Sequence, residues 1–193
     1  IVEFKEQFKP VADEFALRWR LKLSSQRQRM AIFVSHYDHC LADLLYRHRS
    51  RELDCDVPLI ISNHPDSQRL AEFYQIPFHY IAVEKGKRGE AEQQQLALVR
   101  EHKIDLIVLA RYMQILSPEF VRHYPQQIIN VHHSFLPAFS GAKPYHRAFA
   151  RGVKLIGATS HYVTDELDEG PIIEQDVTRA DHTDTVEDLT ARG

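Results

Sequence analysis

The chain has 193 residues, enough for one α/β domain and a small appendage. Its content of 44% hydrophobic and 26% charged residues is typical of a globular protein, and a net charge of −3 excludes a general attraction to nucleic acid or to an anionic membrane surface. No apolar run approaches the ~20 residues of a membrane span. The two cysteines, Cys40 and Cys55, exclude a disulfide framework, so we expect a cytoplasmic protein.

The first 23 residues form a unit of their own in the sequence pattern. Apolar side chains recur at helical spacing within residues 3–16, at Phe4, Phe8, Val11, Ala12 and Phe15. Pro10 lies inside this helix and predicts a kink or a division. Residues 17–23 alternate between apolar and polar, which predicts a half-buried strand, and the polar residues 24–29 are interpreted as a linker. A lone helix and strand cannot bury their apolar faces, so we expect them to dock on another surface.

From Met30 onward, short β-rich runs alternate with helical patterns. This indicates βαβ units in an α/β fold, a Rossmann-like and mainly parallel sheet with helices on both faces. Strands are predicted near residues 30–35, 57–62, 78–83, 104–110 and 127–132. Helices are predicted near residues 39–50, 66–75, 89–102, 118–124 and 143–152. Two further strands, residues 154–164 and 172–177, should be joined by a turn over residues 165–171.

Local signals refine three of these elements. Residues 104–110 are apolar throughout, as in a central strand that is buried on both faces. Ser117 and Pro118 predict a helix start, with serine as N-cap and proline at the first helical position. The first βα turn, residues 35–40, has no glycine and no following lysine, which argues against a nucleotide-binding phosphate loop. We therefore interpret Asp38 as a helix cap.

Asn130 and His132 are the most informative residues of the chain. Alternate side chains of a strand share a face, so these two should project together. An amide and an imidazole at one point can hold a developing oxyanion, and a carboxylate from a second loop can orient the imidazole or activate water. The segments 110–117, 130–137 and 164–171 follow the carboxyl ends of predicted strands, where ligands bind in such sheets. We interpret 110–117 as an apolar wall and 164–171 as the source of the carboxylate.

The twelve histidines raise the alternative of a metal centre. His132 and His133 are adjacent on a predicted strand and should point to opposite faces, which argues against a shared ion. No histidine or cysteine pair stands at a typical ligand spacing. The sequence thus predicts no metal site, and leaves open only a cluster formed by tertiary convergence of His132, His146, His161 and Asp168.

Five stretches carry a family resemblance. They read SHYDHCLADLLYR, VLARYMQILSP, IINVHHSFLPAF, GAKPYHRAF and SHYVTDELDEGPIIEQ. Together they resemble the formyltransferase-fold enzymes that use 10-formyltetrahydrofolate, and within that family the formyltetrahydrofolate deformylases. The resemblance runs from about Met30 to the end of the chain.

The resemblance implies roles for particular residues. Asn130, His132 and Asp168 would be the catalytic trio. The loops 110–117 and 163–170 would enclose the pterin ring, partly through main-chain hydrogen bonds. The substrate-binding residues implied are Met113, Gln114, Ile115, Leu116, Val163, Asp165 and Glu166. His133, Lys143 and Tyr145 are further candidates, although the Lys143 segment is equally well explained as a helix start. No cofactor is implied, because 10-formyltetrahydrofolate is the substrate.

The resemblance also implies a domain organisation. Residues 1–23 are similar to the closing helix and strand of an ACT-type regulatory domain, residues 24–29 are the linker, and residues 30–193 form a formyltransferase-like catalytic domain. ACT domains usually bind small amino acids and pair into oligomers. An amino-acid effector and a homo-oligomer are therefore expected, beside the folate substrate.

Three functions are compared. Hydrolysis of 10-formyltetrahydrofolate to formate, as a supply for purine biosynthesis, is favoured because the turn 35–40 is bulky and acidic and should serve a phosphorylated acceptor poorly. His133 also stands where the related glycinamide ribonucleotide transformylases tend to carry proline. The alternatives are formyl transfer to an amine acceptor and non-catalytic sensing of a folate.

Overall fold

The computed structural model describes residues 2–17, 19, 21, 26–139, 141 and 143–192, with only the backbone described for Val2. Residues from Gln28 onward form a seven-stranded sheet of order β3-β2-β1-β4-β5-β6-β7. Its strands are β1 (Gln28–Val34), β2 (Cys55–Ser62), β3 (Phe78–Tyr80), β4 (Leu106–Ala110), β5 (Ile128–His132), β6 (Leu155–Tyr162) and β7 (Ile172–Arg179). The five strands β3, β2, β1, β4 and β5 are parallel to one another. Strand β6 is antiparallel to both of its neighbours, β5 and β7. The predicted mainly parallel sheet is confirmed.

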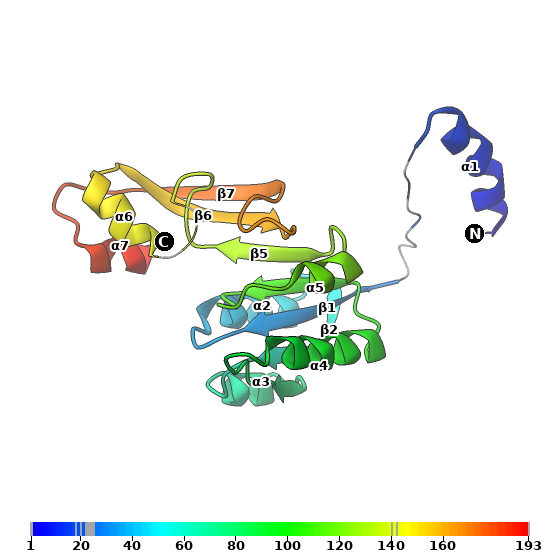
Figure 1. Cartoon of the computed structure of the whole chain (residues 1–193), viewed down its shortest axis with the longest axis horizontal. Coiled ribbons are helices and arrows are strands. Elements are labelled where there is room, and N and C mark those ends of the chain that lie inside the picture. The colour runs from blue at the N-terminus through cyan, green and yellow to red at the C-terminus, as the bar shows by residue number, and fades with distance from the viewer. Residues whose placement is uncertain are drawn as a thin grey trace.

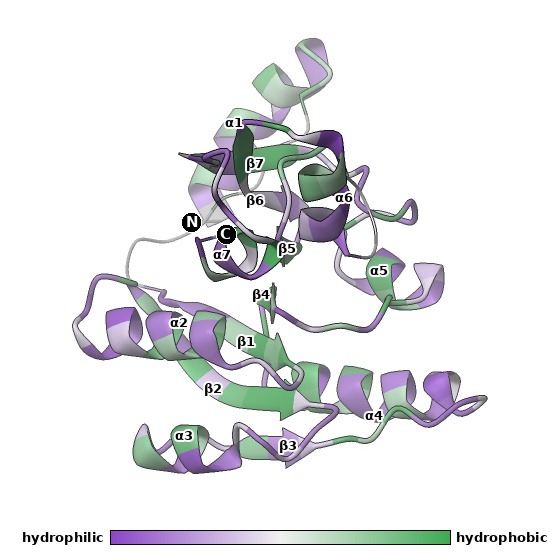
Figure 2. Cartoon of the chain, turned by 90° about the vertical axis from the view of Figure 1, so that its left-hand side faces the viewer, coloured by the Kyte–Doolittle hydropathy of each residue, from purple (hydrophilic) through white to green (hydrophobic). Residues whose placement is uncertain are grey.

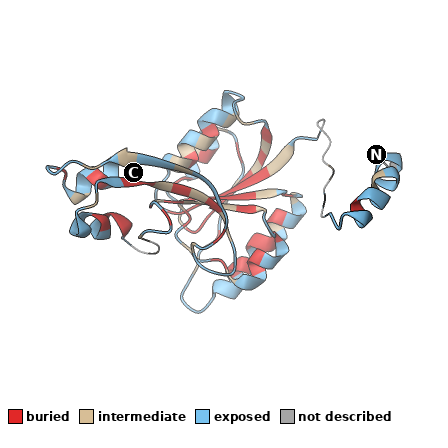
Figure 3. Cartoon of the chain, turned by 90° about the horizontal axis from the view of Figure 1, so that it is seen from above, coloured by how far each residue is buried: buried red, intermediate tan, exposed pale blue. Residues whose placement is uncertain are grey.

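Helices cover both faces of the sheet (Figure 2). The helices α2 (His39–Arg49) and α3 (Gln68–Phe73) pack on one face, and α4 (Arg88–Glu101) and α5 (Pro118–His123) on the other. The helices α6 (Pro144–Arg151) and α7 (Val186–Arg192) share a small third core with β6. Figure 3 shows that buried residues follow the strands and the inner sides of these helices. The five helices predicted after residue 30 are confirmed, with ends shifted by one or two residues.

Strand β4 lies at the centre of the sheet, as its apolar sequence predicted. Ile107 and Leu109 belong to the core on one face, and Val108 and Ala110 belong to the core on the other. An alternation of polar and apolar residues would place polar side chains in one of these cores. The uniformly apolar strand is therefore explained by burial on both faces.

Two of the predicted helix starts have different outcomes. Ser117 is the N-cap of α5, its hydroxyl oxygen accepts from the amide of Phe120 at 3.1 Å, and Pro118 is the first helical residue. That prediction is confirmed. Asp38 occupies the N-cap position of α2, but its side chain makes no capping hydrogen bond. The predicted position was correct and the predicted interaction was wrong.

The helix α1 (Val2–Glu14) lies apart from the sheet (Figure 1). It is assigned as one helix through Pro10, so a division at this residue is wrong. The ring of Phe8 packs edge-on against Trp19, with ring centroids 5.0 Å apart. Of the strand predicted over 17–23, residues 17, 19 and 21 are described and lie in no strand, and the others fall outside the described residues. The ACT-like assignment of residues 1–23 stays a prediction.

None of the helices in the described part of the chain has the length and apolar character that crossing a membrane requires.

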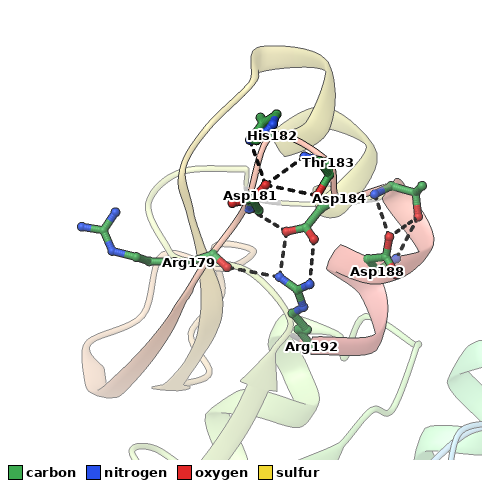
Figure 4. A network of polar contacts seen from close by, with 8 residues as sticks. Arg179, Asp181, His182, Thr183, Asp184, Asp188 and Arg192 are labelled. Atoms are coloured by element: carbon green, nitrogen blue, oxygen red, sulfur yellow. Dashed lines mark hydrogen bonds and ion pairs between the residues drawn. The ribbon is translucent and has the colours of Figure 1, made fainter.

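A polar network fixes α7, a helix that the sequence analysis missed (Figure 4). Arg192 donates to both carboxylate oxygens of Asp184, at 2.7 and 2.6 Å, which ties the end of the helix to the loop that leads into it. At the start of the helix, the amide of Asp188 donates to the hydroxyl of Thr185, and the amide of Thr185 donates to the carboxylate of Asp188. This reciprocal capping of Thr185 and Asp188 is a signal that the sequence offers for the helix.

Candidate active site

Asn130, His132 and Asp168 converge at one edge of the sheet. Asn130 and His132 lie two residues apart on β5 and line the same cavity, as the strand alternation predicted. Asp168 comes from the turn between β6 and β7, and one carboxylate oxygen lies 3.6 Å from Nδ1 of His132. The side chains of His132 and Asp168 are only 8% and 5% exposed. The structure therefore brings together the three residues that the sequence placed in a catalytic trio.

The backbone conformation and one hydrogen bond fix the position of Asp168. Its φ of 59° lies in the left-handed region, which aspartate tolerates better than most residues. Its second carboxylate oxygen accepts from the amide of Gly141 at 3.1 Å. This contact joins the turn between β6 and β7 to the segment before α6. The carboxylate is consequently oriented by two loops.

His161 is a fourth residue at this point, and the sequence analysis considered it only as a metal ligand. It lies opposite Asn130 in the pairing of β5 with β6 and is 2% exposed. Its Nδ1 lies 3.0 Å from the carbonyl oxygen of Tyr162, which assigns the ring proton to Nδ1. Its Nε2, 3.2 Å from Nδ2 of Asn130, is then the acceptor for one amide proton. His161 thereby orients the Asn130 amide, and the antiparallel register of the two predicted strands could have revealed it.

Burial decides the protonation of His132. Desolvation lowers the pKa of the imidazole, and the nearby carboxylate of Asp168 opposes this with a smaller raising effect. Asp168 alone would favour the protonated ring, but burial outweighs it, so the resting imidazole is neutral at neutral pH.

His133 faces the same cavity as His132, which corrects the prediction of opposite faces. Strand β5 ends at His132, so strand alternation no longer applies to the next residue, and the two ring centroids lie 5.3 Å apart. Burial, followed by the charge of Arg111, lowers the pKa of His133 to about 4. A neutral imidazole therefore lies beside His132 throughout the physiological pH range.

The lowered pKa of His133 predicts that stability falls in acid. Between its ordinary value of 6.5 and the folded value of about 4, the unfolded chain binds a proton that the folded chain does not. The free energy of unfolding should be insensitive to this residue above about pH 6.5 and decline below it, by up to about 3 kcal/mol before solvent screening. Urea unfolding from pH 7.5 to 4.5 measures the decline. His133→Asn should flatten it, whereas His182→Asn, at an exposed site outside the cavity, should not. An unchanged slope in His133→Asn would contradict the assignment.

The trio opens into a cavity of about 770 Å³. The predicted segments 110–117, 130–137 and 164–171 all contribute to its lining. The residues assigned to substrate binding from the resemblance all lie in this lining, namely Met113, Gln114, Ile115, Leu116, Val163, Asp165 and Glu166. His133, Lys143 and Tyr145 line it as well. A cavity of this volume is in the range that encloses a small organic ligand.

Arg111 corrects the prediction that residues 110–117 form a purely apolar wall. It follows β4 directly, lines the cavity, and has a φ of 60°, in the left-handed region. Its guanidinium lies over the ring of Tyr37, 5.4 Å from the ring centroid. The sequence analysis took the turn 35–40, which contains Tyr37, as unfavourable for anions. The structure places a cation against that turn.

Unpaired polar atoms gather at this cavity. In the described part of the chain, Nε and Nη1 of Arg111, Nε2 of His132 and the hydroxyl of Tyr145 are buried without a hydrogen-bond partner. All three residues line the cavity. Buried polar groups without partners are costly, and they are found where a ligand supplies the missing partners. Three further atoms of this kind, in Ser67, His79 and Gln95, belong to residues outside the cavity lining, so four of the seven such atoms in the described chain lie at the cavity, as expected for the binding site of a polar ligand.

Gly170 imposes a strict steric requirement beside the turn that carries Asp168. A Cβ added at this residue would overlap the carbonyl oxygen of Tyr162, at the end of β6. We expect Gly170→Ala to lower the free energy of unfolding by about 1–3 kcal/mol and to lower activity further, because the turn that carries Asp168 must move. Thermal unfolding and turnover measure the two effects. Gly89→Ala is the matched control, because nothing lies within 4 Å of the added atom. Equal behaviour of the two variants would contradict the prediction.

The alternative metal cluster is only partly assembled. His132 and His161 lie 3.6 and 3.8 Å from one carboxylate oxygen of Asp168, and His146 lines the cavity. Among the described residues, the group whose donor atoms all lie within 4.8 Å of one another is a different one, formed by His36, His64 and Asp66. These residues follow β1 and β2 and are not part of the cavity lining.

Comparison with known proteins places this site in a family. The formyl transferase family profile matches residues 28–193. The chain is 52% identical to formyltetrahydrofolate deformylase of Synechocystis sp. over 99% of its length and 67% of the relative, and 54% identical to that of Bacillus subtilis over 94% and 61%. It thus spans about two thirds of the length of these curated relatives.

Solved structures give the same result. A formyltetrahydrofolate deformylase from Pseudomonas syringae superposes with a TM-score of 0.95 and 52% identity, over 98% of this chain and 64% of the other. A phosphoribosylglycinamide formyltransferase from Bacillus halodurans superposes with a TM-score of 0.81 and 32% identity, over 86% of this chain and 87% of the other. The chain belongs to the formyl transferase family, among relatives that are named formyltetrahydrofolate deformylase.

Proposed function

We propose that this protein hydrolyses 10-formyltetrahydrofolate to formate and tetrahydrofolate. The observation that carries the proposal is the convergence of an amide, an imidazole and a carboxylate, from Asn130, His132 and Asp168, at the wall of a large cavity. These three groups can bind an oxyanion, transfer protons and orient water. The names of the relatives at about 50% identity support the same reaction.

The folate would lie between the two loops that follow β4 and β6. The loop after β4 contributes Met113 and Ile115, which are 54% and 57% exposed and can cover a flat heterocycle. The loop after β6 contributes residues 163–168. An apolar wall beside polar groups suits a pterin, which is planar and has polar edges. The formyl group at N10 would then face the trio.

The reaction would begin with a neutral His132 beside the carboxylate of Asp168. Asp168 orients the attacking water, and the His132–Asp168 pair takes up the proton that water loses as its oxygen bonds to the formyl carbon. The carbonyl becomes an oxyanion, which accepts from the remaining Nδ2 proton of Asn130 and from the newly protonated imidazole. His161 holds the other amide proton of Asn130, so the donor is already oriented before the reaction.

Collapse of the tetrahedral intermediate breaks the bond between the formyl carbon and N10. The imidazolium of His132 would deliver its proton to the departing nitrogen, which leaves as the neutral amine of tetrahydrofolate. Formate remains, and the second proton of the water is released to solvent. The lowered pKa of His132 suits this cycle, because a neutral ring accepts a proton first and then donates it readily.

Formyl transfer to an amine is the second candidate. The superposition on a phosphoribosylglycinamide formyltransferase favours it, because the two chains share a fold at 32% identity. A transferase needs a place for an amine beside the formyl carbon. In this chain the bulky residues Tyr37, Arg111 and His133 line the cavity, which leaves less space than small residues would, and water needs little space.

The test is formate release from 10-formyltetrahydrofolate without an added amine. We expect one formate for each tetrahydrofolate formed, at a rate that added amines do not change. Formate release that is no faster with the protein than in a protein-free control would sink the proposal. Turnover that begins only when glycinamide ribonucleotide or another amine is supplied would establish the transferase instead.

The proposed reaction suggests a cellular setting. Hydrolysis would supply formate for purine biosynthesis and return tetrahydrofolate to the folate pool, in the cytoplasm. An amino-acid effector that acts through the N-terminal segment, and a homo-oligomer, belong to the same proposal.

A further inference from the structure

Arg111 is a cation in the cavity lining that has no counter-ion among the residues that the structure describes. No ion pair joins it to any of the residues that the structure describes, and two of its guanidinium nitrogens, Nε and Nη1, are buried and unpaired. A buried cation normally has an anionic or polar partner. The Arg111 guanidinium therefore has the character of a binding group whose partner is a ligand.

The neighbours of Arg111 define where its charge lies. Burial lowers the pKa of His133, and the charge of Arg111 is the next largest cause. Burial raises the pKa of Tyr145, and the charge of Arg111 is again the next largest influence, in the opposite direction. Arg111 also contributes to the lowered pKa of His132, after burial and the closer groups. The charge of Arg111 therefore acts on His132, His133 and Tyr145, and all four residues line the same cavity.

Two nitrogens of the guanidinium, Nε and Nη1, have no hydrogen-bond partner among the described residues. The central carbon lies over the ring of Tyr37, 5.4 Å from the ring centroid. The N–H groups of a guanidinium lie in its plane, so a ring on the face does not consume them. A planar carboxylate accepts such N–H groups along the edge, in a charge-assisted pair. The site is consequently built for a small planar anion.

We propose that Arg111 forms a binding subsite for a carboxylate, and that its occupant is the formate produced in the cavity. This rests on the proposed hydrolysis, in which the bond to N10 breaks, the oxygen of water stays on the formyl carbon, and a neutral formyl group becomes an anion. The substrate offers no negative charge at this position, whereas the product does. Arg111 therefore attracts the product at this position and does not attract the substrate.

The conformation of Arg111 supports a specific role. Arg111 is one of nine residues other than glycine with a positive φ in the described chain, and three of these nine, Arg111, Lys143 and Asp168, line the cavity. Such a backbone costs about 1 kcal/mol or more at a residue other than glycine. The left-handed turn directly after β4 directs the side chain back over Tyr37 and into the cavity.

The test combines product inhibition with direct binding. Formate is titrated into the folate-hydrolysis assay at constant ionic strength, beside chloride, acetate and inorganic phosphate. In parallel, the binding of ¹³C-labelled formate is measured from NMR line broadening in the absence of any folate.

We expect formate to inhibit and bind more tightly than chloride, and Arg111→Gln to weaken both effects at least tenfold. Arg111→Lys should be intermediate, because it keeps the charge and loses the planar edge. Arg122→Gln, an exposed arginine of α5, is the matched control and should behave as the unaltered protein.

The carboxylates of the glutamate tail of folate are the other source of the same chemistry. If Arg111 bound the tail, Arg111→Gln would raise KM for the glutamate-bearing substrate, leave KM for the 10-formyltetrahydropteroate analogue unchanged, and leave formate binding unchanged. That result would overturn the proposal, as would formate binding no better than chloride, or phosphate binding far more tightly than formate. A protein that binds formate through Arg111 but releases none from the folate would separate the two proposals, because the subsite would stand and the hydrolysis would fail.

Discussion

Replacing Asp168 with asparagine is expected to lower the rate of formate release by about 1,000-fold, the contribution of a well-placed general base. Asparagine is nearly isosteric with aspartate and tolerates the left-handed backbone that this residue adopts. It can also accept from the Gly141 amide in place of the carboxylate. The variant should therefore keep the stability of the unaltered protein and lose only its rate of formate release. Steady-state formate release and thermal unfolding, measured on the same sample, check both statements.

Glu169→Gln is the control for Asp168→Asn. It removes one negative charge from the adjacent residue, which is exposed and outside the cavity lining. We expect it to keep turnover within about threefold of the original, as for an exposed charge. Wild-type turnover in Asp168→Asn would remove Asp168 from the proposed mechanism. Equal losses in both variants would point to the charge of the loop instead of the position of one carboxylate.

Replacing His132 with glutamine should lower turnover by about 100- to 10,000-fold, because the variant can neither accept the proton of water nor donate one to N10. Glutamine fills most of the space of the buried ring and offers one donor, so affinity for tetrahydrofolate should change little. The comparison to make is between kcat and the dissociation constant of the product. A large loss of binding with unchanged kcat would show that His132 only shapes the cavity.

The pH profile gives an independent check on His132. Burial lowers its pKa below the ordinary 6.5, so the reactive neutral ring persists as the pH falls from 8 to about 6.5. We expect kcat/KM to stay level over that interval and to decline at lower pH, where the ring takes up a proton before substrate binds. A decline that begins above pH 7 would mean that Asp168 outweighs burial.

The sequence predicted the sheet and most of its helices for one physical reason. Periodicity and end signals are local, and in this chain they agree with the tertiary environment, as the apolar β4 and the Ser117 cap show. The prediction failed where that agreement was absent. Helix α7 is only seven residues long and has little apolar periodicity, so the capping pair Thr185 and Asp188 was its sole local signal.

The convergence of Asn130, His132 and Asp168 was predictable from alternation and from the resemblance, but the environment of these residues was not. His133 left the strand pattern because β5 ends one residue earlier, a boundary that sequence patterns place poorly. Arg111 was absorbed into an apolar segment, since nothing in the order of residues shows that a left-handed turn directs its side chain into the cavity. His161 required knowledge of strand register, which depends on two segments distant in the chain.

The antiparallel hairpin of β6 and β7 has a consequence for how activity is lost. Asp168 belongs to its turn, and β7 is an edge strand, largely exposed along its length, whereas Asn130 and His132 belong to a strand inside the sheet. Edge elements open at a lower free-energy cost than the strands that carry the core. Mild heat or denaturant would then withdraw the carboxylate while the parallel strands stay folded, and the protein would become catalytically silent before its global unfolding transition. The temperature at which activity is lost would then depend on the stability of the hairpin of β6 and β7. Substitutions that stabilise only the core would not raise that temperature.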